Sequence, residues 1–232
     1  MLFYNFSKKS VFFVLTIFIL SCDSQVPSAS REESKTLELK ETKSIKISNI
    51  EGNITVSKSQ SDGIVVRSIK KSSVESDLSK VDVVITEGEN LLVSADYKTT
   101  SSNTSVDFFV SIPADIIVSV KNTKGDITIS DIKNVDTIKS NSASVVVSNS
   151  ETIKEIVIDT GTVTAKITKM LSDVLVKVTT GNIKLIVTTD DYKKIDAKTT
   201  AGNIYRILSE YGLGIYNIAA ETISGSITIS YQ

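Results

Sequence analysis

The sequence predicts an all-β protein whose strands are stacked as a solenoid, and three observations carry that prediction. The chain has only two Pro and no Trp, and it is rich in the β-branched residues that favour strands. From Leu37 onward, polar and apolar residues alternate with the period of strands that bury one face. A Gly-x-Ile string recurs at near-regular spacing through the second half of the chain, which is typical of a repeat architecture.

The first 21 residues have the pattern of a secretory signal peptide. Lys8 and Lys9 precede an apolar run, Val11–Leu20. A helix of that length covers about 15 Å, half of the roughly 30 Å of hydrocarbon that a membrane span must cross. The alternative is a longer span over residues 2–20, but it would place both lysines within the bilayer at about 2.5–3.5 kcal/mol each. Residues 1–21 are therefore expected to be removed on export.

The residues around the predicted cleavage point resemble a bacterial lipobox. Ile19-Leu20-Ser21-Cys22 places an apolar and a small residue before the only Cys of the chain. The resemblance implies cleavage before Cys22, diacylglycerol on its sulfur and a further acyl chain, such as palmitate, on its amino group. The alternative is a leftover thiol at a conventional cleavage site. Whether Asp23 acts as a sorting signal stays open.

The mature chain divides into a tether and one domain. Residues 22–36 hold the lipidated Cys and a polar, charged stretch that predicts a flexible tether. Residues 37–232 form a single repetitive domain, with N-terminal strands over 37–112 and regular rungs over 113–232. Asp62-Gly63 and Glu87-Gly88 are expected as hairpin turns, and residues 73–80 as a short turn of helix.

The repeat centres on glycines that start each Gly-x-Ile string. From Gly125 the slots follow at steps of 18, 18, 20, 21 and 23 residues, and Ala143 fills one of them. A glycine before Asn, Asp or Ser indicates a sharp corner, because glycine reaches positive φ without steric cost. The predicted structural turn glycines are Gly52, Gly125, Gly161, Gly181, Gly202 and Gly225.

Each unit is thus a strand, a corner and a second strand, and it buries its apolar side only by stacking on its neighbours. Parallel rungs about 4.8 Å apart would align like residues in columns. Hydrogen-bonded ladders are expected beside the corners from Thr160, Thr180, Thr200, Asn182 and Asn203. A sandwich of hairpins is the alternative fold, and it suits the N-terminal strands better than the later repeats.

Two features of the last rungs bear on the end of the stack. Arg206 stands four residues after Gly202, where an apolar residue is expected. A β-bulge that turns Ile207 inward is the favoured interpretation, and a charge at a surface site is the alternative. Ile227–Tyr231 is expected to cap one end, where an open edge could self-associate.

These residues resemble the family of bacterial putative adhesins. The resemblance covers residues 37–232 and is carried by the segments 44–56 and 108–132 and by the later Gly-x-Ile strings, although one such triplet alone is weak evidence. It implies a right-handed β-helix or β-roll, a cell-envelope location and no catalytic residues. The chain departs from the pattern at Ala143 and Arg206.

Several kinds of site are excluded by composition. The chain has no His, which removes imidazole bases, His metal ligands and His-based pH switches. One Cys excludes intramolecular disulfides and thiolate-rich metal sites. The formal net charge of -1 gives no reason to expect nucleic acid. The acidic pairs Glu32-Glu33 and Asp190-Asp191 are interpreted as solvated charge, so no cofactor, metal or catalytic residue is expected.

The sequence therefore predicts a lipid-anchored, non-enzymatic, adhesin-like binding module of the bacterial cell envelope. Its partners are the membrane, through Cys22, and an unknown protein or glycan ligand. One alternative is a periplasm-facing structural or envelope-stress scaffold, and another is a polysaccharide-acting β-helix enzyme. The membrane, the leaflet, the ligand, the binding residues and the oligomeric state stay open.

Overall fold

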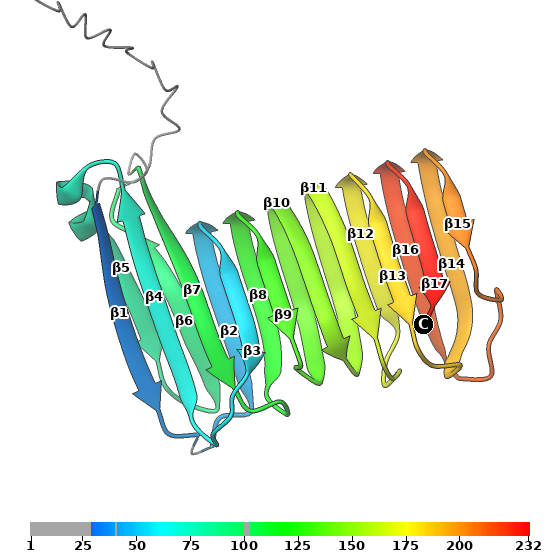
Figure 1. The fold of residues 1–232 in the computed structure, drawn as a ribbon, viewed down its shortest axis with the longest axis horizontal. Coiled ribbons are helices and arrows are strands. Elements are labelled where there is room, and N and C mark those ends of the chain that lie inside the picture. The colour runs from blue at the N-terminus through cyan, green and yellow to red at the C-terminus, as the bar shows by residue number, and fades with distance from the viewer. Residues whose placement is uncertain (1–28, 40, 100–102) are drawn as a thin grey trace, which may run out of the picture.

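The computed structural model describes residues 29–39, 41–99 and 103–232, and it is an all-β stack (Figure 1). Cys22 and the predicted signal peptide lie outside the described residues. In the described part, no helix is long and apolar enough to cross a membrane. The N-terminal elements are β1 (Ala29–Leu37), β2 (Ser44–Glu51), β3 (Ile54–Lys58), β4 (Ile64–Ser72), the 3-10 helix η1 (Glu75–Lys80), β5 (Val81–Thr86), β6 (Asn90–Tyr97) and β7 (Thr104–Ile112).

The remaining strands form the regular part of the stack. They are β8 (Ile117–Lys124), β9 (Ile127–Ser130), β10 (Asn134–Ser150), β11 (Thr152–Ile167), β12 (Val174–Thr180), β13 (Ile183–Val187), β14 (Tyr192–Ala201), β15 (Ile204–Arg206), β16 (Tyr216–Ser224) and β17 (Ile227–Tyr231).

Each rung gives one strand to each of two facing layers. One layer runs β5-β6-β2-β8-β10-β11-β12-β16-β14, and the other runs β1-β4-β7-β3-β9-β10-β11-β13-β17-β15. The long strands β10 and β11 belong to both layers, because their two halves have different neighbours. The fold is solenoid-like, as the repeat predicted, with a rung of two strands.

The core lies between the two layers. Alternate residues of each rung point inward, so that Ile45 and Ile47 of β2 meet Ile54 and Val56 of β3, and all four are fully buried. Their outward neighbours Lys46 and Thr55 face solvent. The same alternation repeats in every rung up to β16 and β17, which explains why the sequence shows a two-residue period.

The N-terminal strands mix the two pairing directions. β1, β4 and β7 pair antiparallel, and so do β5 and β6, whose hairpin at Glu87-Gly88 was predicted. The predicted hairpin at Asp62-Gly63 is wrong, because β4 pairs with β1 and β7 and β3 pairs with β7 and β9. The first parallel rung is β2–β3, which lies directly beside β8–β9.

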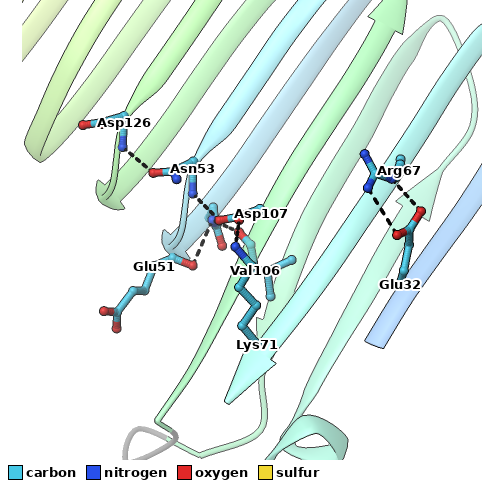
Figure 2. Close-up of polar contacts among 9 residues, drawn as sticks. Glu32, Glu51, Asn53, Arg67, Lys71, Val106, Asp107 and Asp126 are labelled. Carbon is cyan, nitrogen blue, oxygen red and sulfur yellow. Dashed lines mark hydrogen bonds and ion pairs between the residues drawn. The ribbon is translucent and has the colours of Figure 1, made fainter. Parts of the chain in front are cut away.

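The predicted tether over residues 22–36 ends earlier than expected. Residues from Ala29 form β1, which pairs with β4 along its whole length. The stretch lacks apolar residues because it is an edge strand, and charged side chains are how edge strands avoid further pairing. Glu32 binds Arg67 of β4 through both carboxylate oxygens, at 2.6 and 3.2 Å (Figure 2). Glu33 pairs with Lys70 at 3.3 Å. Glu32 and Glu33 are therefore cross-strand ion pairs of the fold and do not belong to a solvated tether.

The glycines that open the Gly-x-Ile strings stand in one column at the corners. Gly52, Gly125, Gly161, Gly181, Gly202 and Gly225 all have positive φ, between 121° and 151°. At Gly181 a Cβ would lie 1.6 Å from the carbonyl oxygen of Gly161 in the next rung. The corner therefore needs glycine both for its backbone angle and for the close approach of the neighbouring rung.

A hydrogen-bond ladder runs beside this column, through the residue after each glycine. The backbone N–H of Asn53 donates to Asp107 Oδ1 at 2.8 Å, and the backbone N–H of Asp126 donates to Asn53 Oδ1 at 2.9 Å (Figure 2). The ladder continues to Ser144, and further on Asn182 accepts from the Ser226 amide. Asn182 was predicted for such a ladder. Thr160 and Thr180 occupy matching register positions in adjacent strands.

A second set of bonds lies inside the corner and holds the carbonyl groups of the glycines. The side-chain amide of Asn122 donates to the carbonyl oxygens of Gly52 and Gly125, at 2.9 and 3.1 Å. The Thr222 hydroxyl donates to Gly181 O at 3.1 Å. Backbone polar groups that lose contact with water need such partners, so these side chains satisfy the glycine carbonyl groups at the sharp corner.

The rungs do not stack in chain order at the C-terminal end. β16 and β17 pair with β12 and β13 on one side and with β14 and β15 on the other. The prediction that Ile227–Tyr231 caps the stack is therefore wrong. The rung of β16 and β17 carries fully buried Ile218, Ile227 and Ile229, whereas Ile204 of β15 is 43% exposed. The rung of β14 and β15, which buries fewer large apolar side chains, therefore lies at the end of the stack.

Candidate interaction surface at the C-terminal end

The terminal rung, β14 and β15, is followed by a loop that turns back over its own edge. The connection from β15 to β16, residues 207–215, runs along the free end of the stack (Figure 1). The Ile195 amide of β14 donates to Glu210 O at 2.9 Å, and Lys194 and Tyr211 form an antiparallel bridge. The loop thus covers part of the strand edge that β14 would otherwise leave open.

Two glycines bring this loop against the start of β14. Gly212 N–H donates to Lys193 O at 3.3 Å, and Gly214 N–H donates to Tyr192 O at 3.0 Å. A Cβ on Gly214 would lie 1.6 Å from Asp191 O, so only glycine permits this approach. The residue between them, Leu213, keeps its own amide bonded to Asp190 O at 3.0 Å. The loop backbone is therefore fixed on both sides of the Leu213 side chain.

Tyr192 anchors the beginning of the loop from within the core. Its side chain is buried, and its hydroxyl donates to Ser209 O at 3.2 Å. Burial, followed by the charge of Asp190, raises the pKa of the Tyr192 phenol. The phenol therefore stays protonated at neutral pH and keeps its hydrogen bond to the loop.

The fixed loop leaves most of its large apolar side chains in solvent, whereas Leu208 packs against the core. Leu213 is 93% exposed and Ile207 is 77% exposed, and both Ile215 and Tyr211 are exposed as well. We call these four residues the apolar tip. Exposed apolar residues are common singly, but a group of them on one short rigid loop is typical of an interaction surface.

Arg206 lies at the base of the apolar tip. Its guanidinium approaches Glu210 Oε2 at 3.4 Å, and Glu210 also lies 4.0 Å from Lys194. The predicted bulge that would turn Ile207 inward is wrong, because Ile207 is among the most exposed residues of the chain. Arg206 is in register with the inward-facing Ile229 of β17. A charged side chain is tolerated at this position because no further rung stacks on β15 and the side chain keeps contact with water.

The charges around the apolar tip balance. Residues 190–215 contain the acidic side chains Asp190, Asp191, Asp196 and Glu210 and the basic side chains Lys193, Lys194, Lys198 and Arg206. Asp196 and Lys198 pair at 3.0 Å, and this hydrogen bond lowers the pKa of Asp196 and raises that of Lys198. The surface that surrounds the tip is thus close to neutral.

A hollow at the N-terminal end offers a weaker candidate. It has a volume of about 480 Å³ and is lined by the apolar Leu37, Ile64 and Leu91 together with four glutamates, Glu38, Glu41, Glu87 and Glu89. Lys35 pairs with Glu87 at 2.9 Å and Lys43 with Glu89 at 2.7 Å. Within the described residues, no group of His, Cys, Asp or Glu is placed to hold a metal ion. Two of the four acids of the hollow, Glu87 and Glu89, are engaged in these ion pairs, and the apolar tip remains the better site.

Of the apolar tip, sequence reasoning named Ile207 alone and expected it to point inward. It singled out the turn glycines, which lie in the corner column, and Cys22, which lies outside the described residues. Of the acidic pair Asp190-Asp191, the backbone carbonyl of Asp190 accepts a hydrogen bond from the tip loop, and that of Asp191 lies close against Gly214. A signal for the tip was present: the step from Gly202 to Gly225 is the longest of the series, and Gly212 and Gly214 fall within it.

The stacked two-layer fold and its corner column can be compared with known proteins. The family model described as Toastrack DUF4097 matches residues 23–232. The chain belongs to the Toastrack DUF4097 family. No curated protein matches the sequence.

Solved structures are also similar to this chain. One is a putative cell adhesion protein from Clostridium sporogenes, with 15% identity, coverage of 88% of this chain and 100% of that chain, and a TM-score of 0.53. Another is a putative adhesin from Bacteroides fragilis, with 14% identity, coverage of 89% and 99%, and a TM-score of 0.45. At 15% identity the likeness to the Clostridium sporogenes protein is one of fold. The family membership expected from residues 37–232 is confirmed by the family match.

Proposed function

We propose that this Toastrack chain is a non-enzymatic binding module of the bacterial cell envelope, held to a membrane by lipid on Cys22. The observation that carries the proposal is the apolar tip, which two glycines fix on the end of the stack farthest from β1 (Figure 1). Because β1 begins near the proposed anchor, the tip is the part of the domain that reaches farthest from it. The names of the structural relatives support an adhesin-like role.

The position of the chain in the envelope is tested by protease accessibility on intact cells. We expect the domain to be digested while a periplasmic control protein survives. Survival of the domain until the envelope is opened would contradict the adhesin role and would favour the periplasm-facing scaffold.

The anchor is tested separately in the full chain. We expect Cys22→Ala to abolish labelling of the protein by a radioactive or clickable fatty acid, because the chain has no other Cys. Continued labelling of the Cys22→Ala variant would show that the lipid is attached elsewhere, and an unlabelled wild-type chain would contradict the lipoprotein assignment.

The role of the tip is tested by attachment of cells to a surface or to other cells. We expect Leu213→Ser to weaken attachment, because it removes the most exposed apolar side chain of the tip without touching the core. Ile50→Ser, at an exposed apolar position of β2, is the matched control and should leave attachment intact. Equal attachment by the wild type and Leu213→Ser would exclude the tip as the binding surface.

A further inference from the structure

The two ends of the stack differ in polarity. A solenoid needs a polar outer face on its terminal repeats to stay soluble and separate. The β1 edge follows this rule, since it carries Arg31, Glu32, Glu33 and Lys35, while β5 at the same end leaves only Val84 exposed among its large apolar residues, at 41%. The opposite end places Ile207, Tyr211, Leu213 and Ile215 in solvent. An end built in this way is expected to be covered by another surface.

We propose that the apolar tip binds the apolar tip of a second copy of this chain, so that two copies join end to end. The proposal deepens the proposed function, on which it rests, by naming the partner of the same surface. The tips would meet in an isologous contact, in which each residue of one copy faces the same patch of the other.

The charge around the tip favours a second copy over a membrane. An isologous contact brings a surface against itself, so any net charge on it would be repelled. Residues 190–215 carry equal numbers of acidic and basic side chains and meet this condition. Binding to anionic lipid headgroups would draw on an excess of Lys and Arg near the apolar residues, and no such excess is present.

The difference between the ends favours a closed pair over an open filament. Head-to-tail stacking would place the apolar tip against β1, where Glu32 and Arg67 are engaged in an ion pair at the surface. Covering these charges with apolar side chains would cost desolvation without new partners. Tip-to-tip contact avoids this cost and leaves both β1 edges in water.

The end of the stack is large enough for a specific contact. β14 has 10 residues, which span about 33 Å, and two packed layers with their outer side chains are about 20 Å thick. The end face therefore offers about 660 Å² per copy, or about 1,300 Å² for the pair, which reaches the range of specific interfaces.

The geometry of the pair follows from the position of the tip. An end-to-end isologous contact has its two-fold axis across the stack, so the two β1 ends lie at opposite extremes (Figure 1). With strands about 4.8 Å apart, each copy extends about 43 Å from β1 to β15. Two chains anchored near β1 would thus join two membranes that face each other.

The test uses the full lipidated chain displayed on phosphatidylcholine vesicles, with aggregation followed by light scattering. We expect vesicles that carry the wild-type chain to aggregate with one another and not with bare vesicles. Leu213→Asp and Ile207→Asp should each slow aggregation by roughly tenfold or more, because each substitution enters the contact twice. Ile50→Asp, an exposed apolar position on β2, is the matched control and should aggregate like the wild type.

A cross-linking test reports the same contact on cells. Once Cys22 is acylated, Leu213→Cys carries the only free thiol of the chain, and mild oxidation should give a disulfide-linked dimer. Ile50→Cys should stay monomeric. Dispersed wild-type vesicles, aggregation with bare vesicles, or aggregation unchanged by both Asp variants would each overturn the proposal. If dispersed vesicles accompany weaker attachment of Leu213→Ser cells to other surfaces, self-recognition is wrong while the binding module stands.

Discussion

At the scale of single residues, the corner of each rung depends on the absence of a Cβ at one position. Gly181 has a φ of +140° and lies against Gly161 O of the neighbouring rung. Ala143 stands in the equivalent slot of its rung without a positive φ, and its carbonyl group faces Gly161. One column thus contains positions that require glycine and a position that accepts alanine.

This contrast predicts unequal effects of two small substitutions. Gly181→Ala should lower the free energy of unfolding by about 2–4 kcal/mol, because it combines backbone strain with a clash against the next rung. Ala143→Gly should lower it by only about 0.5–1 kcal/mol, through the entropy of the unfolded chain. Urea unfolding followed by circular dichroism measures both. Equal losses for the two variants would mean that the column does not constrain the stack.

The partly buried phenol of Tyr97 should make the folded chain less stable at alkaline pH. Its hydroxyl donates to Glu51 O at 3.2 Å, and burial raises the pKa of the phenol from 10.0 to about 12. Below pH 10 the phenol is protonated in both the folded and the unfolded chain, so stability is unaffected. Between pH 10 and pH 12 the unfolded chain ionises first, and the free energy of unfolding falls.

Tyr97→Phe tests this assignment. The variant should lose about 1 kcal/mol at pH 7 through the missing hydrogen bond, and its stability should fall less steeply between pH 10 and pH 12. Tyr211→Phe makes the same change at an exposed loop position and should keep the wild-type profile. A Tyr97→Phe profile as steep as that of the wild type would assign the alkaline transition to other groups.

At the scale of elements, β1 shows how a strand can form without an apolar face. It pairs with β4 over nine residues, and Glu32 holds Arg67, whose guanidinium also lies 4.8 Å from the centre of the Phe109 ring. The hydrogen bond from Arg67 lowers the pKa of the Glu32 carboxyl group. The stabilisation by this ion pair is therefore fully present above pH 4.5, the ordinary pKa of glutamate, and it is lost as the pH falls through the lowered pKa of Glu32.

The contribution of this pair to β1 is tested by charge reversal. Arg67→Glu should speed amide exchange in residues 29–37 at neutral pH, because it places two carboxylates side by side on neighbouring strands. The double variant Glu32→Arg with Arg67→Glu restores opposite charges and should recover most of the protection. Hydrogen exchange with mass spectrometry reads out this segment directly. Exchange that is unchanged in Arg67→Glu would show that the backbone ladder alone holds β1.

At the scale of the whole molecule, the stack has the charged edge strand β1 at one end and the apolar tip at the other. β1 blunts its end with charge, whereas the loop over residues 207–215 covers β14 with its backbone and leaves its apolar side chains in solvent. The rung of β16 and β17 produces this arrangement, because its insertion beside β12 and β13 leaves the irregular rung of β14 and β15 at the end of the stack. The order of rungs in space thus decides which residues form the interaction surface.

The sequence alone determined the local chemistry of the rungs. The two-residue alternation, the Gly-x-Ile strings and their spacing were enough to predict strands, corners, parallel stacking and the family. They were enough because each depends on residues close together in the chain: a glycine sets its own corner, and alternate residues share one face.

Only the tertiary structure decided which strands pair at the ends of the stack. In Ala29–Leu37 only Leu37 is a large apolar residue, and the residues of β4 that pair with this strand lie 27 to 43 positions away in the chain. The insertion of β16 and β17 depends on which rung buries its residues best between two neighbours, and that is a comparison between distant segments. The apolar tip follows from this choice, because Leu213 is exposed only where no further rung is added.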